Sequence, residues 1–228
     1  MKPLMNVFKT GCLAMLMIVL QSGLHAQSPK FQDAMTKALA GFDTIQSADG
    51  MMDLANKFER IALAEKNQWL PYYYSGLCRA TASFMYNDVT RIDALMEVAE
   101  KHAALADSLS PSNSEVLTLR SMILGARIMV DPMTRGQQYG MQSMMLLQQA
   151  MNLDPNNPRP YYLMGQSLFY TPPQFGGGQA AGCNLLQTAK TKYAGFTPAS
   201  PLHPNWGEEQ VDQALKQCAE TKDPVTGE

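Results

Sequence analysis

Apolar side chains recur along most of this chain with the 3.6-residue period of an α-helix, and almost no segment alternates with period two. The clearest example begins at Pro158. There Tyr161, Met164, Gly165 and Leu168 fall at positions i, i+3, i+4 and i+7 of one helical face. The preceding asparagine can cap this helix, and a proline in first position costs no hydrogen bond. The pattern therefore predicts an all-α protein.

The same period predicts the other helices. They are expected over residues 32–42, 51–64, 69–85, 91–109, 112–130, 134–151, 158–170, 179–193 and 206–219. Capping boxes, in which a polar residue precedes Glu or Gln by three positions, are read at Ser112, Thr134 and Asn205.

The joints between helical hairpins are evenly spaced. Polar, turn-forming triplets at residues 66–68, 111–113 and 155–157 each follow one amphipathic helix and precede another. Their spacing of about 44–45 residues is the self-similarity expected of stacked helical hairpins.

Residues around the last joint resemble the tetratricopeptide-repeat family. Tyr161, Met164-Gly165 and Leu168 match its first helix, and Leu147, Ala150 and Pro155 match its second helix and joint. Weaker matches are Phe58, Tyr72, Gly76, Ala99, Ala106, Pro111, Leu117 and Leu124. The resemblance covers residues 30–195. It implies a right-handed solenoid of stacked antiparallel hairpins in one domain, 27–228, closed by a capping helix at about 206–219.

The first 26 residues have the features of a secretory signal peptide. Lys2 and Lys9 precede a short apolar run, 12–20, and the segment ends at Leu24-His25-Ala26. Cleavage is expected after Ala26, a junction that resembles those of Bacteroidetes exported proteins. Cys12 precedes the apolar run, which argues against lipidation. We therefore expect a periplasmic or secreted protein, with no membrane span in the mature chain.

Charge excludes one class of partner. The formal net charge is −2, and loss of Lys2 and Lys9 with the signal peptide makes it −4. The chain has no basic block that could neutralise phosphates, so nucleic acid is not an expected partner.

Three cysteines remain after cleavage. Cys78 lies within a helical pattern and is expected to pack as a small apolar residue. Cys183 and Cys218 each lie on a late helix, and an oxidising compartment allows a disulfide between them. Three buried thiols are the alternative.

The family resemblance also implies a binding surface. First helices line the concave face of such arrays, and Tyr and Arg are common interface anchors. The candidate binding residues are Tyr73, Arg159, Tyr162, Gln166, Phe169 and Phe175. Phe175 lies in a Pro- and Gly-rich loop, 171–178, which is either a structural turn or a recognition loop. These residues favour a scaffold that binds a protein or peptide. The alternative is a solute-binding component of an uptake system.

No motif predicts catalysis, a cofactor or a metal. Gly176-Gly177-Gly178 begins a match to a dinucleotide fingerprint, but neither a preceding strand nor a following acidic residue accompanies it. The methionine-rich segment 122–151 lacks the histidines of a copper site. His102 is expected to be exposed, and His203 lies in a Pro-rich linker, 198–204. We therefore expect a binding protein that is not an enzyme. Its oligomeric state stays open.

Overall fold

The computed structural model describes residues 28–220, and all regular secondary structure in this range is helical, with no strand. The all-α prediction is confirmed. The signal peptide and its cleavage point lie outside the described residues. Among the residues described, no helix is long and apolar enough to cross a bilayer.

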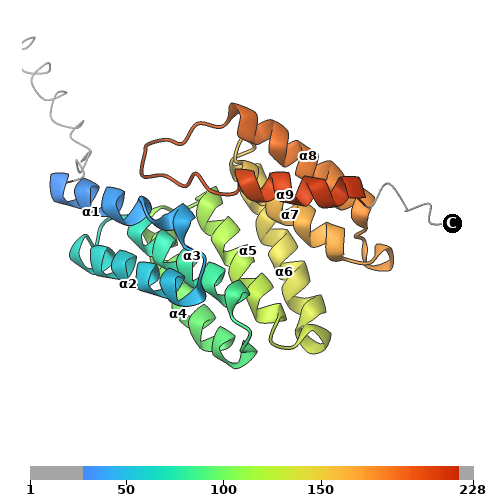
Figure 1. The fold of residues 1–228 in the computed structure, drawn as a ribbon, viewed down its shortest axis with the longest axis horizontal. Helices are drawn as coiled ribbons and strands as arrows, with labels where there is room; N and C mark the ends of the chain where they lie inside the picture. The colour runs from blue at the N-terminus through green and yellow to red at the C-terminus, as the bar shows by residue number, and fades with distance from the viewer. Residues whose placement is uncertain (1–27, 221–228) are drawn as a thin grey trace, which may run out of the picture.

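Nine α-helices and three short 3-10 helices follow one another in the described range (Figure 1). The α-helices are α1 (Pro29–Leu39), α2 (Ala48–Ala64), α3 (Trp69–Met85), α4 (Ile92–Leu109), α5 (Ser114–Ile128), α6 (Pro132–Leu153), α7 (Pro158–Tyr170), α8 (Gln179–Gly195) and α9 (Glu208–Glu220). The 3-10 helices are η1 (Phe42–Thr44), η2 (Val89–Arg91) and η3 (Pro173–Phe175).

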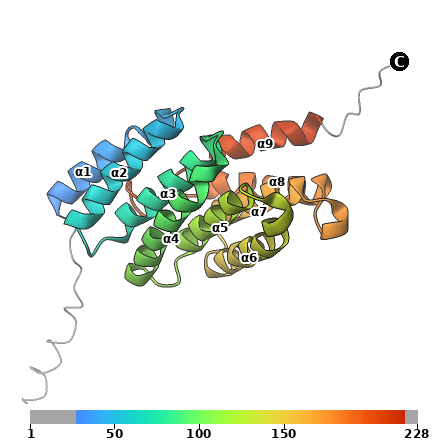
Figure 2. The same cartoon turned by 90° about the horizontal axis from the view of Figure 1, so that it is seen from below.

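The helices pack as antiparallel neighbours in a row. Each helix from α1 to α9 contacts the next one along the chain, and α3, α5 and α7 also contact one another in turn. Figure 2 shows the row from α1 and α2 at one end to α7, α8 and α9 at the other. This arrangement places the starts of α3, α5 and α7 at the same edge of the row.

Polar caps fix where several helices begin. The side chain of Asn157 accepts a hydrogen bond from the amide of Arg159 at 3.0 Å, as predicted, and Asn113 caps α5 in the same way. The capping boxes read at Ser112 and Thr134 are wrong, since Asn113 is the cap of α5. Asp131 caps α6 instead, and the helix begins at Pro132, whose missing N–H needs no partner.

Two glycines set the distance between α7 and α8. A β-carbon on Gly182 would lie 2.6 Å from the backbone of Phe169, and one on Gly165 would lie 3.0 Å from the carbonyl oxygen of Gly182. The two helices therefore pack backbone against backbone, which larger side chains would prevent.

We expect Gly182→Ala to lower the free energy of unfolding by about 1–3 kcal/mol, because the new methyl group would push α7 from α8. Gly140→Ala is the matched control. It lies within α6 with no atom within 4 Å of the new β-carbon, so it should raise stability by up to about 1 kcal/mol. Urea denaturation measures both. Equal effects of the two variants would contradict the close packing.

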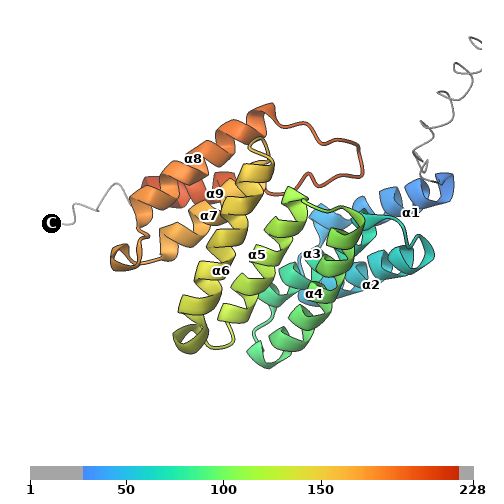
Figure 3. The same cartoon turned by 180° about the vertical axis from the view of Figure 1, so that it is seen from behind.

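A long connection, residues 196–207, joins α8 to α9, and we call it the strap. It leaves α8, passes over the edge of the row towards α3 and returns to α9 (Figures 1 and 3). Leu202 is buried in the same apolar cluster as the residues of α3. Gly207 has a φ of 109°, a conformation that favours glycine. Helix α9 therefore begins at Glu208 and not at the predicted capping box at Asn205.

A disulfide between Cys183 and Cys218 joins α8 to α9, so the bond that the sequence allowed is present. Cys78 is a buried free thiol. The disulfide closes a loop of 35 residues that contains the whole strap. It therefore limits how far the strap and α9 can separate from the helical row.

Reduction should destabilise the protein by about 2–4 kcal/mol, because an open loop gives the unfolded chain more conformational freedom. Thermal melts with and without reductant test this. The Cys183→Ser/Cys218→Ser variant should melt at the temperature of the reduced wild type and should not respond to reductant. A wild-type melt that reductant leaves unchanged would contradict the stabilising role.

Candidate functional site

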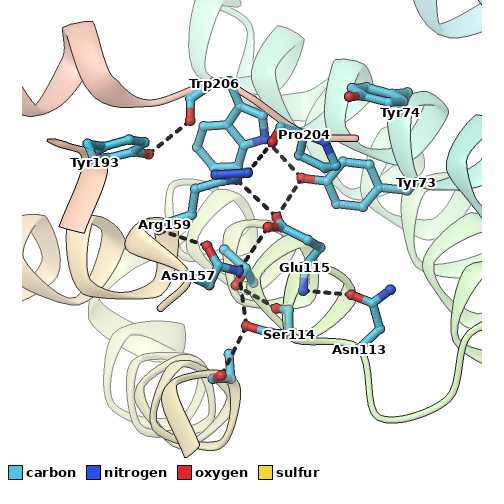
Figure 4. A network of polar contacts seen from close by, with 12 residues as sticks. Tyr73, Tyr74, Asn113, Ser114, Glu115, Asn157, Arg159, Tyr193, Pro204 and Trp206 are labelled. Carbon is cyan, nitrogen blue, oxygen red and sulfur yellow. Dashed lines mark hydrogen bonds and ion pairs between the residues drawn. The ribbon is translucent and has the colours of Figure 1, made fainter. Parts of the chain in front are cut away.

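A buried ion pair lies where α3, α5 and α7 begin. Arg159 Nε donates a hydrogen bond to Glu115 Oε2 at 3.0 Å (Figure 4). The Arg159 side chain is fully buried, and that of Glu115 is 14% exposed. Both residues lie in the first turn of a helix, so the pair joins α5 to α7.

Three further side chains complete this network. Asn157 Nδ2 donates to Glu115 Oε1 at 2.9 Å, and Tyr73 OH donates to Oε2 at 3.3 Å. Trp206 Nε1, from the strap, donates to Tyr73 OH at 2.9 Å. Figure 4 shows side chains from α3 and the start of α7 converging on the carboxylate of α5, with the strap attached through Tyr73. The carboxylate therefore holds elements together that are far apart in sequence.

Burial and charge shift the ionisation of these groups. Burial raises the pKa of Glu115, and the Arg159 charge opposes that shift. Burial disfavours the charge of Arg159, but Glu115 and the surrounding tyrosines outweigh this effect, so its pKa is raised. Burial and then the Glu115 charge raise the pKa of Tyr73 well above its usual range. Tyr73 is therefore a neutral hydrogen-bond donor at physiological pH.

Arg159 also contacts the strap. Its Nη2 donates to the carbonyl oxygen of Pro204, and its guanidinium carbon lies 4.7 Å from the centre of the Phe196 ring. Nη1 is buried and has no hydrogen-bond partner among the described residues. An unpaired buried donor on a cation is unfavourable.

A cleft of about 430 Å³ lies between the strap and the edge of the helical row, and we call it the strap cleft. The row contributes Trp69, Ser110, Pro111, Ser112, Asn113, Ser114, Glu115, Leu153, Asp154 and Arg159, and the strap contributes Phe196, Thr197, Ala199, His203 and Pro204. The walls thus combine aromatic rings with polar groups. The starts of α3, α5 and α7 and the ends of α4 and α6 meet here, so helix dipoles of both signs face the cleft.

His203 is half-buried in this cleft and not in a featureless linker. Its Nδ1 lies 2.7 Å from Ser200 Oγ, and its ring lies 5.7 Å from that of Trp69 in an edge-on arrangement. Burial lowers the pKa of His203. The expectation that His102 is exposed is wrong. That residue is buried, with Nε2 3.7 Å from Glu59.

A second cavity of about 490 Å³ lies between α1 and α2, and we call it the α1–α2 groove. Its floor is apolar and includes Phe31 and Ile61, while Lys30, Lys57 and Arg60 are among the charged residues that line it. It contains no histidine, cysteine, methionine or tyrosine. The two cavities therefore differ in the chemistry they offer a ligand.

The predicted exposed groove is wrong for three of its residues. Tyr73, Arg159 and Tyr162 are buried. The strap covers Tyr73, and α9 packs in the same apolar cluster as Tyr162. Gln166 and Phe169 are half-buried, and Phe175 is 72% exposed. These six residues do not form one surface, because the strap and α9 cover the face that the family resemblance predicts to be an open concave groove.

Sequence reasoning missed most residues of the strap cleft. The sequence places Glu115 in a capping box and residue 69 at the start of a helix, and neither pattern indicates a cleft. The signal that could have indicated the strap is the Pro-rich segment 198–204 with a histidine inside it, since such a stiff segment places its side chains reproducibly.

A solved structure matches this chain over nearly the whole length of that structure. The HusA haemophore from Porphyromonas gingivalis is 35% identical, with a TM-score of 0.77. The match covers 87% of this chain and 97% of the haemophore. The chain belongs to the family of this haemophore. No protein-family model and no curated protein matches it, so the tetratricopeptide resemblance stays an expectation.

We expect Glu115→Ala to lower the free energy of unfolding by about 3–5 kcal/mol, because it would leave the buried Arg159 charge unpaired. The matched control is Glu97→Ala, which removes an exposed ion pair with Lys101 on α4. This control should leave the denaturation midpoint unchanged. A similar small effect of both substitutions would contradict the structural role of the buried pair.

Proposed function

We propose that this protein captures haem or a closely related porphyrin, without transforming it. The similarity to the HusA haemophore carries the proposal, at 35% identity over 97% of that chain. The sequence left two functions open, binding of a peptide and binding of a small solute. A haemophore relative supports the second.

The strap cleft has properties that suit such a ligand. A porphyrin with carboxylate side chains is planar and apolar, with charge at one edge. The cleft offers the rings of Trp69 and Phe196 together with the Arg159 cation. Its volume of about 430 Å³ lies within the usual range of small-molecule sites. The rings favour a ligand with a flat aromatic face, while the Arg159 charge is balanced by Glu115 in the same lining.

Peptide capture in an open concave groove has less support. It needed Tyr73, Arg159 and Tyr162 on a free surface, and all three are buried. A tetratricopeptide-like solenoid is compatible with the row of hairpins, but it does not require a peptide partner. The expected signal peptide would place the protein in the periplasm or outside the cell, where a ligand carrier could act.

Titration with iron protoporphyrin tests the proposal. The chain has two tryptophans, and Trp69 lines the strap cleft while Trp206 lies against Arg159. We expect saturable quenching of their fluorescence with one equivalent of ligand, together with a change in the porphyrin absorbance. A double variant in the α1–α2 groove, Lys57→Ala/Arg60→Ala, should bind as the wild type does. Absence of both optical changes would contradict the proposed function.

A further inference from the structure

We propose that the α1–α2 groove is the docking site for an amphipathic helix of a partner protein, with acidic side chains on both sides of its apolar stripe. The groove and the strap cleft share no lining residue. This docking is therefore independent of the proposed function, and each can fail without the other.

The groove has the dimensions of a helix-binding site. Its lining residues run from Lys30 to Ala38 on α1 and from Lys57 to Glu65 on α2. Each of these stretches rises about 12 Å at 1.5 Å per residue, which is a little over two helical turns. Ala34 and Ala38 line the groove, and small side chains at such a contact let another helix approach closely. An amphipathic helix with apolar anchors at i, i+3, i+4 and i+7 is a common occupant of an apolar groove.

The groove lies on the first hairpin of the row, at the end opposite α9 (Figure 2). Among the described residues, only those of α1 and α2 line it, and none belongs to α3 or a later helix. Phe31 is buried in its floor, and Ile61 is half-buried. The terminal repeats of helical arrays need a polar outer face. An apolar groove on the first hairpin therefore indicates a surface that a further element covers.

Charge favours an acidic occupant. Four exposed cationic side chains line the groove: Lys30, Lys37, Lys57 and Arg60. Lys37 pairs with Asp33 at 2.8 Å, whereas the other three form no ion pair with a described residue. Glu65 is the single carboxylate of the lining, and its Oε1 accepts a hydrogen bond from the Ser28 hydroxyl.

This positive charge is local, because the chain as a whole has a formal net charge of −2. Cations lie on both walls of the groove, Lys30 on α1 and Lys57 and Arg60 on α2. Carboxylates on both sides of an apolar stripe would therefore meet opposite charge along the whole contact.

An anionic lipid surface has less support than a helix. Helices that lie on membranes insert large apolar side chains below the headgroups. Here the largest apolar side chain of the groove, Phe31, is buried, and the residues beside it include Ala34 and Ala38. The cations thus surround a hollow that a discrete segment can fill, and no protruding apolar face accompanies them.

Selection from a displayed library of helical peptides, each about five turns long, tests the proposal on the mature protein. The library randomises both the stripe and its flanks, and binders of the Lys57→Glu/Arg60→Glu variant are removed first. We expect the enriched peptides to have apolar residues at i, i+3, i+4 and i+7 with Asp or Glu on both sides. No enrichment, or enrichment of basic or uncharged helices, would overturn the proposal.

Titration of an enriched, fluorescently labelled peptide then tests the groove itself by anisotropy. Lys57→Glu/Arg60→Glu should weaken binding about tenfold or more, because like charges would face each other. Ala34→Phe keeps the charge and fills the groove, and it should weaken binding as strongly. The control, Lys101→Glu/Lys216→Glu, makes the same charge change at exposed sites on α4 and α9 and should bind within about twofold of the wild type. Wild-type affinity in Ala34→Phe would show attraction by charge without docking, and the proposal would be wrong.

Two further measurements identify other occupants. Sedimentation with phosphatidylglycerol vesicles that the groove variants abolish would assign the groove to a lipid surface. A dimer of the wild type in analytical ultracentrifugation that the groove variants dissociate would assign it to a second copy of the chain. Either result would replace the partner helix. We expect a monomer that does not bind these vesicles, and all variants should keep the helical circular dichroism of the wild type.

Discussion

The buried ion pair between Glu115 and Arg159 is the interaction on which the rest of the site depends. Two charges at this depth are unfavourable unless each finds its full set of partners. Asn157 and Tyr73 satisfy the carboxylate, and the strap satisfies part of the guanidinium. Because these partners come from α3, α5, α7 and the strap, the pair fixes how three helix starts and one long connection meet.

This constraint places the candidate site at the edge of the helical row rather than on its concave face. The strap reaches that edge because Leu202 is buried in the apolar cluster of α3. The disulfide joins the opposite ends of α8 and α9, the two helices that the strap connects. The result is a cleft with one wall of helix starts and one wall of irregular chain. Family membership supports ligand capture, and this cleft is where a cation, an imidazole and aromatic rings come together.

The helices could be predicted from local sequence patterns. The strap and the site it covers could not, because they depend on contacts between residues far apart in sequence. The 3.6-residue period found every α-helix of the described range, and Asn157 and Pro158 fixed the start of α7. The strap has no period, and its anchoring hydrogen bonds join residues 128 and 133 positions apart. Assigning Tyr73 and Arg159 to an open groove was wrong for that reason, since the covering segment could not be placed from sequence.

The central claim is that an iron porphyrin binds in the strap cleft. Amide NMR spectra of the isotopically labelled protein, with paramagnetic iron protoporphyrin and with the metal-free form, test it most directly. The account predicts that iron selectively broadens the signals of residues 110–115 and 196–203, on both walls of the strap cleft. Selective broadening at residues 30–38 and 57–65, which form the α1–α2 groove, would contradict it.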